Sequence, residues 1–286
     1  MKKPLLGIIG GSGLYQMEGL ADVRVIDADT PFGKPSSPII IGNLQDKEVA
    51  FLARHGIGHF LLPSEVNYRA NIYALKALGV QKVVSISAVG SLKEEYAPGH
   101  IIIPDNLFDF TKHNRPQTFF GEGIVGHVSV ADPYCQRLSN LTYEAVKATG
   151  ATTHFGGNLI TIEGPRFSTK AESHVFRSWG MSLIGMTACP EAFLAKEAEL
   201  CYTTMAHVTD YDVWHESEEP VTVEMVIQTL MKNTEYAQQA IVNLIAMLDD
   251  EPCCEGIIKD AIMTAPAAMN PQTRRKLDGL IGKYLK

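Results

Sequence analysis

The sequence has no long apolar segment, no basic run and no repeat. Within its 286 residues, no apolar stretch approaches the roughly 18 residues that a membrane-spanning helix needs. The net charge of -7 and the absence of clustered lysine and arginine argue against a nucleic-acid surface. No internal repeat or low-complexity segment indicates a solenoid or a disordered tail. With 45% hydrophobic residues, the chain can fill the core of one large domain or two small ones.

Cysteine is also scarce. The five cysteines are Cys135, Cys189, Cys201, Cys253 and Cys254. Because they are odd in number and lack the spacing of zinc sites, we expect no metal and a reducing, cytoplasmic compartment. The vicinal pair Cys253-Cys254 is the candidate for oxidation. The N-terminus leads into a short apolar run without a small-residue cleavage site, so no signal peptide is expected.

Periodicity and turn residues predict an α/β chain. The expected strands are 5–9, 38–42, 48–53, 82–87, 101–104, 152–162, 183–187 and 201–208. The expected helices are 64–79, 133–150, 169–179, 190–199, 222–248 and 272–285. Ser64 is expected to cap the first helix, and Thr169 and Glu172 to form a capping box. The segment 109–126 is irregular, which is typical of a functional loop or an interface.

One buried strand is followed by two acidic residues. Cys201 to Val208 is apolar and β-prone, and Thr209 to Trp214 is expected to form the loop after it. Ligands of open α/β sheets bind outside the carboxyl ends of strands. Asp210 and Asp212 suit a ligand with both a hydrogen-bond donor and an atom needing a proton, such as the 6-amino group and N7 of adenine. A surface turn with two solvated aspartates is the alternative.

Other predicted strand ends carry groups suited to an anion. The turn Gly10 to Gly13 lets backbone amides approach a phosphate, and Ser12 adds a hydroxyl. A later strand delivers Arg54 and His55, which can bind a phosphate through charge-assisted hydrogen bonds. A plain glycine turn, an arginine in a structural ion pair and a core histidine are the alternatives at these positions.

The loop 163–168 brings together a carboxylate, an arginine and an aromatic ring. Phe167 can stack on a base, which contributes roughly 1–3 kcal/mol per base. The alternative is a phenylalanine of the core. On its own, this loop does not decide between the two.

Together, these segments resemble the trimeric purine nucleoside phosphorylase family. The resemblance runs from about Gly7 to about Leu248 and is carried in order by residues 10–13, 29–35, 54–56, 63–68, 115–117, 163–168, 186–191 and 209–214. It implies a single domain with a mixed central sheet flanked by helices. The catalytic domain would span 1–250, and 251–286 would form a helical extension packed on it. It also implies a homotrimer, or a hexamer made of two trimers.

The resemblance assigns roles to individual residues. Phosphate would be bound by Ser12, Arg54, His55, Ser87, Ala88 and Thr187. The nucleoside would be bound by His59, Phe167, Ser168, Met186, Asp210, Asp212, Val223, Val226 and the neighbouring subunit's His127. Asp210 and Asp212 would be the catalytic pair. Ser12 stands where family members often carry threonine, so the hydroxyl is retained.

The activity implied is phosphorolysis of S-methyl-5′-thioadenosine to adenine and 5-methylthioribose 1-phosphate. Inorganic phosphate is the co-substrate, and no cofactor or metal is implied. Asp210 would protonate N7 if burial beside Asp212 raises its pKa, and Asp212 would accept from the 6-amino group. The alternatives are a purine nucleoside or methylthioinosine phosphorylase, a nucleosidase that uses water, and a non-catalytic nucleotide-binding α/β protein.

Overall fold

A computed structural model describes residues 3–11, 13–112, 114–215, 223–249, 251 and 253–285. The strands are β1 (Leu6–Gly10), β2 (Ala21–Ile26), β3 (Ile39–Leu44), β4 (Lys47–Ala53), β5 (Lys82–Ser91), β6 (Ile101–Ile103), β7 (Asn106–Phe110), β8 (Thr153–Phe155), β9 (Asn158–Ile162), β10 (Leu183–Gly185) and β11 (Cys201–Asp210). The helices are α1 (Tyr68–Ala77), α2 (Gln136–Lys147), α3 (Lys170–Ser178), α4 (Ala188–Glu197), α5 (Val223–Met247), α6 (Pro271–Lys276) and α7 (Asp278–Ile281). Two 3₁₀ turns are η1 (Pro266–Ala268) and η2 (Gly282–Tyr284).

All the strands belong to one mixed sheet. Its main path is β2-β3-β4-β1-β5-β10-β9-β7, and β11, β6 and β8 continue from β5 as a branch. The centre of the sheet is β5, which pairs in parallel with β1 and β11 and in antiparallel fashion with β10. Because β4, β1, β5 and β11 are parallel, their carboxyl ends meet at one edge.

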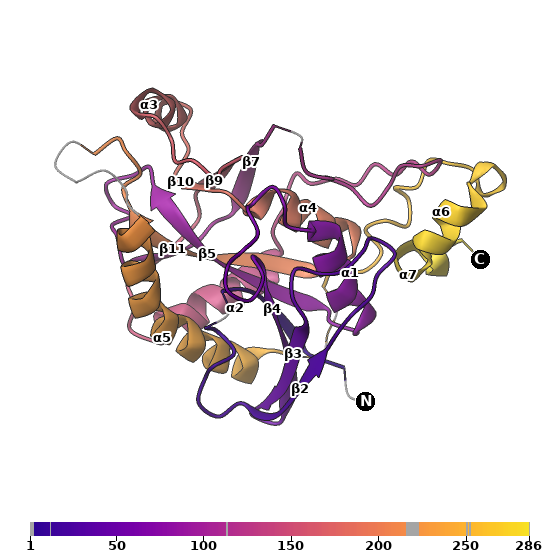
Figure 1. The fold of residues 1–286 in the computed structure, drawn as a ribbon, viewed down its shortest axis with the longest axis horizontal. Helices are drawn as coiled ribbons and strands as arrows, with labels where there is room; N and C mark the ends of the chain where they lie inside the picture. The colour runs from indigo at the N-terminus through magenta and orange to yellow at the C-terminus, as the bar shows by residue number, and fades with distance from the viewer. Residues whose placement is uncertain are drawn as a thin grey trace.

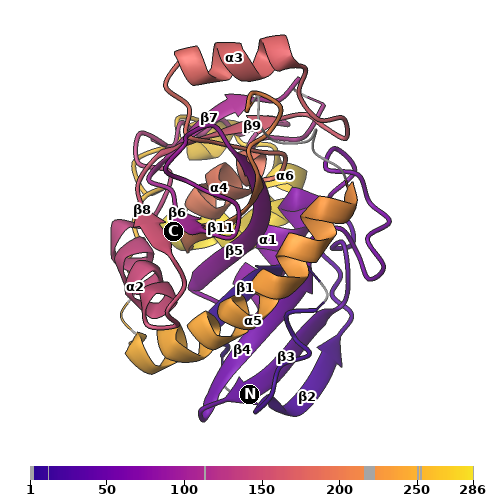
Figure 2. The same cartoon turned by 90° about the vertical axis from the view of Figure 1, so that its left-hand side faces the viewer.

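Side-chain alternation along the strands builds a core on each face of the sheet. In β1, Ile9 packs with α1 and α4, whereas Leu6 and Ile8 pack with α2 and α5. Figures 1 and 2 show these two helix pairs on opposite sides of the sheet, with α5 running diagonally across its face. Among the described residues, no helix combines the length and apolarity that would let it cross a bilayer.

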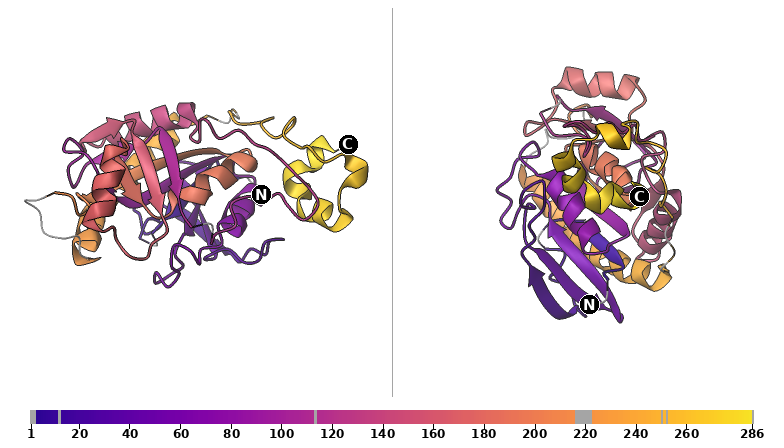
Figure 3. Two further views of the ribbon diagram at one scale, coloured as in Figure 1. Left: turned by 90° about the horizontal axis from the view of Figure 1, so that it is seen from above. Right: turned by 90° about the vertical axis from the view of Figure 1, so that its right-hand side faces the viewer.

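The C-terminal residues lie at one end of the molecule (Figure 3). Their apolar side chains Ile258, Leu277, Leu280 and Ile281 join the core on the α1 side. The segment after β7 runs beside them: His127 donates its backbone N–H to Ala261, at 2.9 Å. Residues 258–281 are thus held by both apolar and backbone contacts.

Several local predictions were wrong in detail. Asn67, not Ser64, caps α1, because its side chain accepts from the backbone N–H of Ala70. The predicted last helix is divided into α6 and α7 at Leu277, and β2 and β7 were not predicted. The capping box of Thr169 and Glu172 at the start of α3 is confirmed.

Candidate active site

The pairing of β5 with β10 and β11 determines which residues meet at the site. β10 runs antiparallel to β5, with Ile184 opposite Gly90, so the chain beyond β10 returns toward Ser87. There the hydroxyls of Ser87 and Thr187 lie 3.5 Å apart. On the other side β11 is parallel, and Asp210 lies opposite Gly90. Ser87 and Gly90 are three residues apart, about 10 Å along a strand, which separates a hydroxyl end of the site from an acidic end.

A bulge places Asp210 at the acidic end. The register between β11 and β5 shifts between Val208 and Asp210, so Thr209 is the extra residue. The strand therefore continues to Asp210, and the predicted loop begins two residues later than expected. Asp210 accepts from the Thr209 hydroxyl at 2.6 Å and from the backbone N–H of Asp212 at 2.8 Å. The second bond closes an Asx-turn. This turn folds the chain so that the side chains of Asp210 and Asp212 lie close together.

Asp210 and Asp212 are each only 7% exposed, which excludes the alternative of a solvated turn. Burial raises the pKa of Asp210 to about 6, and the charge of Asp212 adds to the rise; the hydroxyl of Thr209 and the N–H of Asp212 oppose it. Burial also raises the pKa of Asp212, against the nearby hydroxyls of Ser173 and Ser168. Neither hydroxyl makes a hydrogen bond of normal geometry, and within the described part of the chain Asp212 Oδ2 is left without a partner.

Gly90 packs directly against the two aspartates. A Cβ at this position would lie 2.9 Å from Asp210 Oδ1, 2.9 Å from Ile184 Cγ2 and 3.3 Å from Asp212 Cβ. Distances this short leave no room for a side chain. No functional role for Gly90 was predicted from the sequence, since the contact joins three strands that are far apart in the chain.

Arg54 is buried and firmly paired. Its Nε and Nη2 donate to the two oxygens of Glu191 at 2.8 and 3.0 Å, and Nη2 also reaches Ser85 Oγ at 2.6 Å. Burial alone would lower the pKa of Arg54, but the charge and hydrogen bonds of Glu191 raise it, so the guanidinium stays cationic. Nη1 donates to Ile86 O at 3.2 Å, one residue before Ser87. The charge of Arg54 therefore lies behind the hydroxyl end.

His55 and His59 stack with ring centroids 4.4 Å apart. His55 Nδ1 lies 2.9 Å from Leu61 O. Since a carbonyl only accepts, Nδ1 carries the hydrogen and Nε2 keeps its lone pair. Burial and the charge of Arg54 lower the pKa of His55 to about 4, so the ring is neutral near pH 7. His55 is consequently a hydrogen-bond acceptor at Nε2.

The loop predicted to face the base lies over the acidic end. Ser168 is near Asp212, and Phe167 is 37% exposed rather than part of the core. A Cβ at Gly164 would lie 2.6 Å from Met186 Sδ, so this loop packs directly on Met186.

Arg115 was not given a role from the sequence, although it holds this region together. Its side chain donates to Glu163 O at 2.6 Å, Met186 O at 2.6 Å and Cys189 O at 2.9 Å. It thereby joins the loop 163–168 to the segment that carries Thr187. Its only sequence signal is the motif at 115–117.

Ser12 lies outside the described residues, as do the side chains of Val223 and Val226 in the first turns of α5. His127 is exposed and joined to the C-terminal segment through Ala261. Ala88 lies in β5 beside Ser87 and pairs with His207.

This arrangement belongs to a known family. Residues 5–246 match the Phosphorylase superfamily, and the chain belongs to it. The chain is 51% identical over 284 residues to the S-methyl-5′-thioadenosine phosphorylase of Geobacter sulfurreducens, covering 98% of this chain and 99% of that protein. It is 50% identical over 259 residues to the protein of the same name from Hyperthermus butylicus, covering 88% and 93%.

Solved structures of similar proteins have the same fold. A methylthioadenosine phosphorylase from an antarctic soil metagenomic library superimposes with a TM-score of 0.92 at 46% identity, covering 98% of this chain and 99% of that one. The methylthioadenosine phosphorylase of Schistosoma mansoni, solved with adenine, gives 0.86 at 33% identity, covering 92% and 100%. The predicted fold class, a single α/β domain with a mixed sheet flanked by helices, is confirmed.

Proposed function

We propose that the chain catalyses phosphorolysis of S-methyl-5′-thioadenosine, releasing adenine and 5-methylthioribose 1-phosphate for purine and methionine salvage. Phosphate attacks C1′ while the bond from C1′ to N9 breaks, and the base leaves with its electrons. The observation that carries the proposal is the buried pair Asp210 and Asp212, at the edge where Ser87 and Thr187 meet. Relatives named for this reaction share about half of their residues with the chain.

Asp210 acts on the leaving base. An acid with a pKa of about 6 is protonated in roughly a tenth of the molecules at pH 7, far more than an ordinary aspartic acid. Protonating N7 neutralises the charge that the purine gathers as the bond breaks. Burial thus supplies the proton donor that the reaction requires.

The hydroxyl end holds phosphate. Ser87 and Thr187 donate to its oxygens, the backbone N–H of the adjacent Ala88 adds a donor, and Arg54 lies behind them in its ion pair with Glu191. Nε2 of His55 accepts a hydrogen from a protonated phosphate oxygen. Ser12 would add a donor from the first glycine turn. The reaction needs no resident cofactor or metal, because phosphate is itself the nucleophile.

Around the sugar and base, Met186 and His59 lie against the ribose, and Phe167 and Ser168 cover the purine. From the resemblance, Val223 and Val226 would line the methylthio pocket. His127 enters from a neighbouring subunit.

The assembly is a cytoplasmic homotrimer or a dimer of trimers. The molar mass measured by light scattering tests this.

Asp212 selects a 6-amino purine. The carboxylate oxygens of Asp212 accept hydrogen bonds from a 6-amino group. A 6-oxo group is itself an acceptor, so it would face the carboxylate without a hydrogen between them. A mispaired buried polar group costs roughly 1–3 kcal/mol, or about tenfold to a hundredfold in rate. We therefore expect Asp212→Asn to shift the ratio of kcat/KM values for inosine and adenosine toward inosine by that factor. Asp27→Asn, at an exposed aspartate, is the control. An unchanged ratio would remove this role of Asp212.

The decisive experiment is incubation with S-methyl-5′-thioadenosine, with and without phosphate. We expect adenine and 5-methylthioribose 1-phosphate only when phosphate is present. Free methylthioribose formed without phosphate would identify a nucleosidase. Binding without turnover would identify a non-catalytic nucleotide-binding protein.

A further inference from the structure

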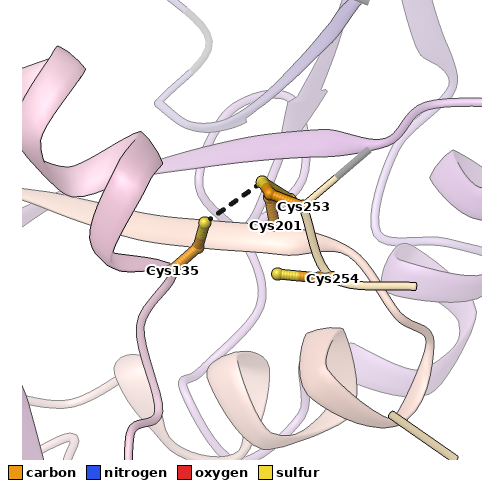
Figure 4. Close-up of side chains that lie close together, drawn as sticks. All are labelled: Cys135, Cys201, Cys253 and Cys254. Atoms are coloured by element: carbon orange, nitrogen blue, oxygen red, sulfur yellow. Dashed lines mark hydrogen bonds between the residues drawn. A yellow bond between two sulfur atoms is a disulfide. The ribbon is translucent and has the colours of Figure 1, made fainter. Parts of the chain in front are cut away.

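Four of the five cysteines gather at one place, away from the catalytic aspartates. Their sulfur atoms all lie within 4.8 Å of one another: Cys135, Cys201, Cys253 and Cys254. Figure 4 shows the four side chains converging from three chain segments. Cysteines at 135, 201 and 253–254 have no zinc-type spacing, so only the fold reveals the cluster.

Each segment is held independently of the sulfur atoms. Cys135 is the N-cap residue of α2, and its N–H donates to Tyr202 O at 2.8 Å, next to Cys201 at the start of β11. Cys253 and Cys254 lie in a bend, and the chain beyond them is fixed where the Ile258 N–H donates to Glu199 at 3.2 Å. Because of the bend, two adjacent cysteines both face the cluster, which an extended segment would not allow.

In the structure Cys201 and Cys253 form a disulfide, and Cys135 Sγ lies 3.3 Å from Cys253 Sγ. The candidate pair for oxidation, Cys253-Cys254, is therefore not the pair that is bonded. Cys135 and Cys254 are thiols in contact with that disulfide.

The distances suit one tetrahedral ion. Zinc binds thiolates at about 2.3 Å, and tetrahedral angles then place each pair of sulfur atoms about 3.8 Å apart. The four sulfur atoms lie within 4.8 Å of one another, so once the disulfide is opened, side-chain movements of about 1 Å bring them to that spacing. A donor set made only of sulfur selects soft ions such as Zn²⁺ over Mg²⁺ or Ca²⁺.

The cluster is also accessible. Two hollows, of about 230 and 440 Å³, lie beside it, and Cys253 and Cys254 line both. Cys201 borders the smaller hollow and Cys135 the larger. An ion or a small reductant therefore has a path to the sulfur atoms.

We propose that, in the reduced chain, these four cysteines bind one Zn²⁺ ion as a structural tetrathiolate site. A dithiol first reduces the Cys201–Cys253 bond: it supplies two electrons and two protons and leaves as its own disulfide. The ion then binds all four sulfur atoms and releases four thiol protons. Bound zinc joins the N-terminus of α2, the start of β11 and the residues that follow α5. This site is independent of the proposed reaction.

The test uses the full chain, reduced under native conditions with a dithiol, freed of reductant and loaded with Zn²⁺. We expect one zinc per chain by elemental analysis after gel filtration. Co²⁺ in its place should give the visible bands of tetrahedral thiolate coordination. Zinc should raise the melting temperature of the reduced protein. A reduced protein that binds no zinc, or a disulfide that resists native reduction, would overturn the proposal.

Cys254→Ser distinguishes zinc binding from disulfide formation, because Cys254 takes no part in the disulfide. Loss of a metal ligand should weaken zinc binding by at least about 100-fold, the upper end of what outer-shell changes cost. Cys189→Ser is the matched control, since Cys189 is a buried free cysteine outside the cluster. Equal zinc affinity in the two variants would show that Cys254 is not a ligand and would overturn the tetrathiolate site.

Discussion

At the scale of single residues, the site depends on how Asp210 is held. Its nearest partner is the hydroxyl of Thr209, at 2.6 Å, which favours the charged carboxylate and so keeps the pKa from rising further. The same residue supplies the bulge that sets Asp210 opposite Gly90. One threonine thus fixes both the position and the proton affinity of the acid.

Thr209→Val should move the pH profile of catalysis. Valine keeps the shape but removes a hydrogen bond to a charged group, worth about 1.5 kcal/mol, so the pKa of Asp210 should rise by about one unit. The protonated acid then persists to higher pH, and the alkaline limb of kcat/KM should shift upward by about that amount. The measurement is the profile at saturating phosphate, whose own titration is the same for both proteins.

Thr142→Val is the control, because that buried threonine lies in α2 and its hydroxyl has no hydrogen-bond partner in the described part of the chain. If both variants kept the parent profile, Asp210 would not be the group that titrates.

At the scale of elements, three strands converge on Gly90. We expect Gly90→Ala to displace Asp210, because the new Cβ would lie 2.9 Å from its Oδ1. Overpacking costs roughly 1–3 kcal/mol of stability, and a shift of about 1 Å at a catalytic group costs about 100-fold in rate. Steady-state kinetics with urea unfolding would measure both.

Gly185→Ala in the neighbouring β10 tests whether any added methyl group is harmful. Its Cβ would lie 3.4 Å from Val89 Cγ1, an ordinary contact, so we expect nearly parental activity. Equal losses in the two variants would contradict a special role for Gly90.

At the scale of the whole molecule, a buried histidine couples stability to pH. His207 in β11 is 0% exposed, and neither ring nitrogen has a hydrogen-bond partner among the residues described. Burial lowers its pKa to about 4, whereas an unfolded histidine titrates near 6.5. Between these values the unfolded chain binds a proton that the native chain does not. Stability is therefore lost as the pH falls through this window, by about 3 kcal/mol.

His207→Gln should remove this contribution. Urea unfolding at pH 7 and pH 4.5 should show a smaller loss of unfolding free energy in the variant than in the parent. His55, whose pKa is also near 4, likewise lowers the unfolding free energy as the pH falls, whereas Asp210, whose pKa is raised, increases it. Because parent and variant both contain His55 and Asp210, these contributions cancel in the comparison. Equal pH dependence in parent and variant would mean that His207 is not buried and neutral.

The sequence by itself determined the α/β pattern, the buried strand that leads to Asp210 and the motifs at the strand ends. These are local signals: side-chain periodicity, turn residues and caps such as Thr169 with Glu172. The local signal failed where two candidates competed, as at the start of α1, where Asn67 rather than Ser64 accepts a backbone N–H.

Only the tertiary structure decided which distant residues meet. The bond of Arg54 to Glu191, the contact of Gly90 with Asp210 and the convergence of four cysteines all join segments far apart in the chain. Such contacts depend on strand order and register, which a single sequence does not encode at any one position. Burial, and with it the raised pKa of Asp210, is likewise a property of the assembled sheet.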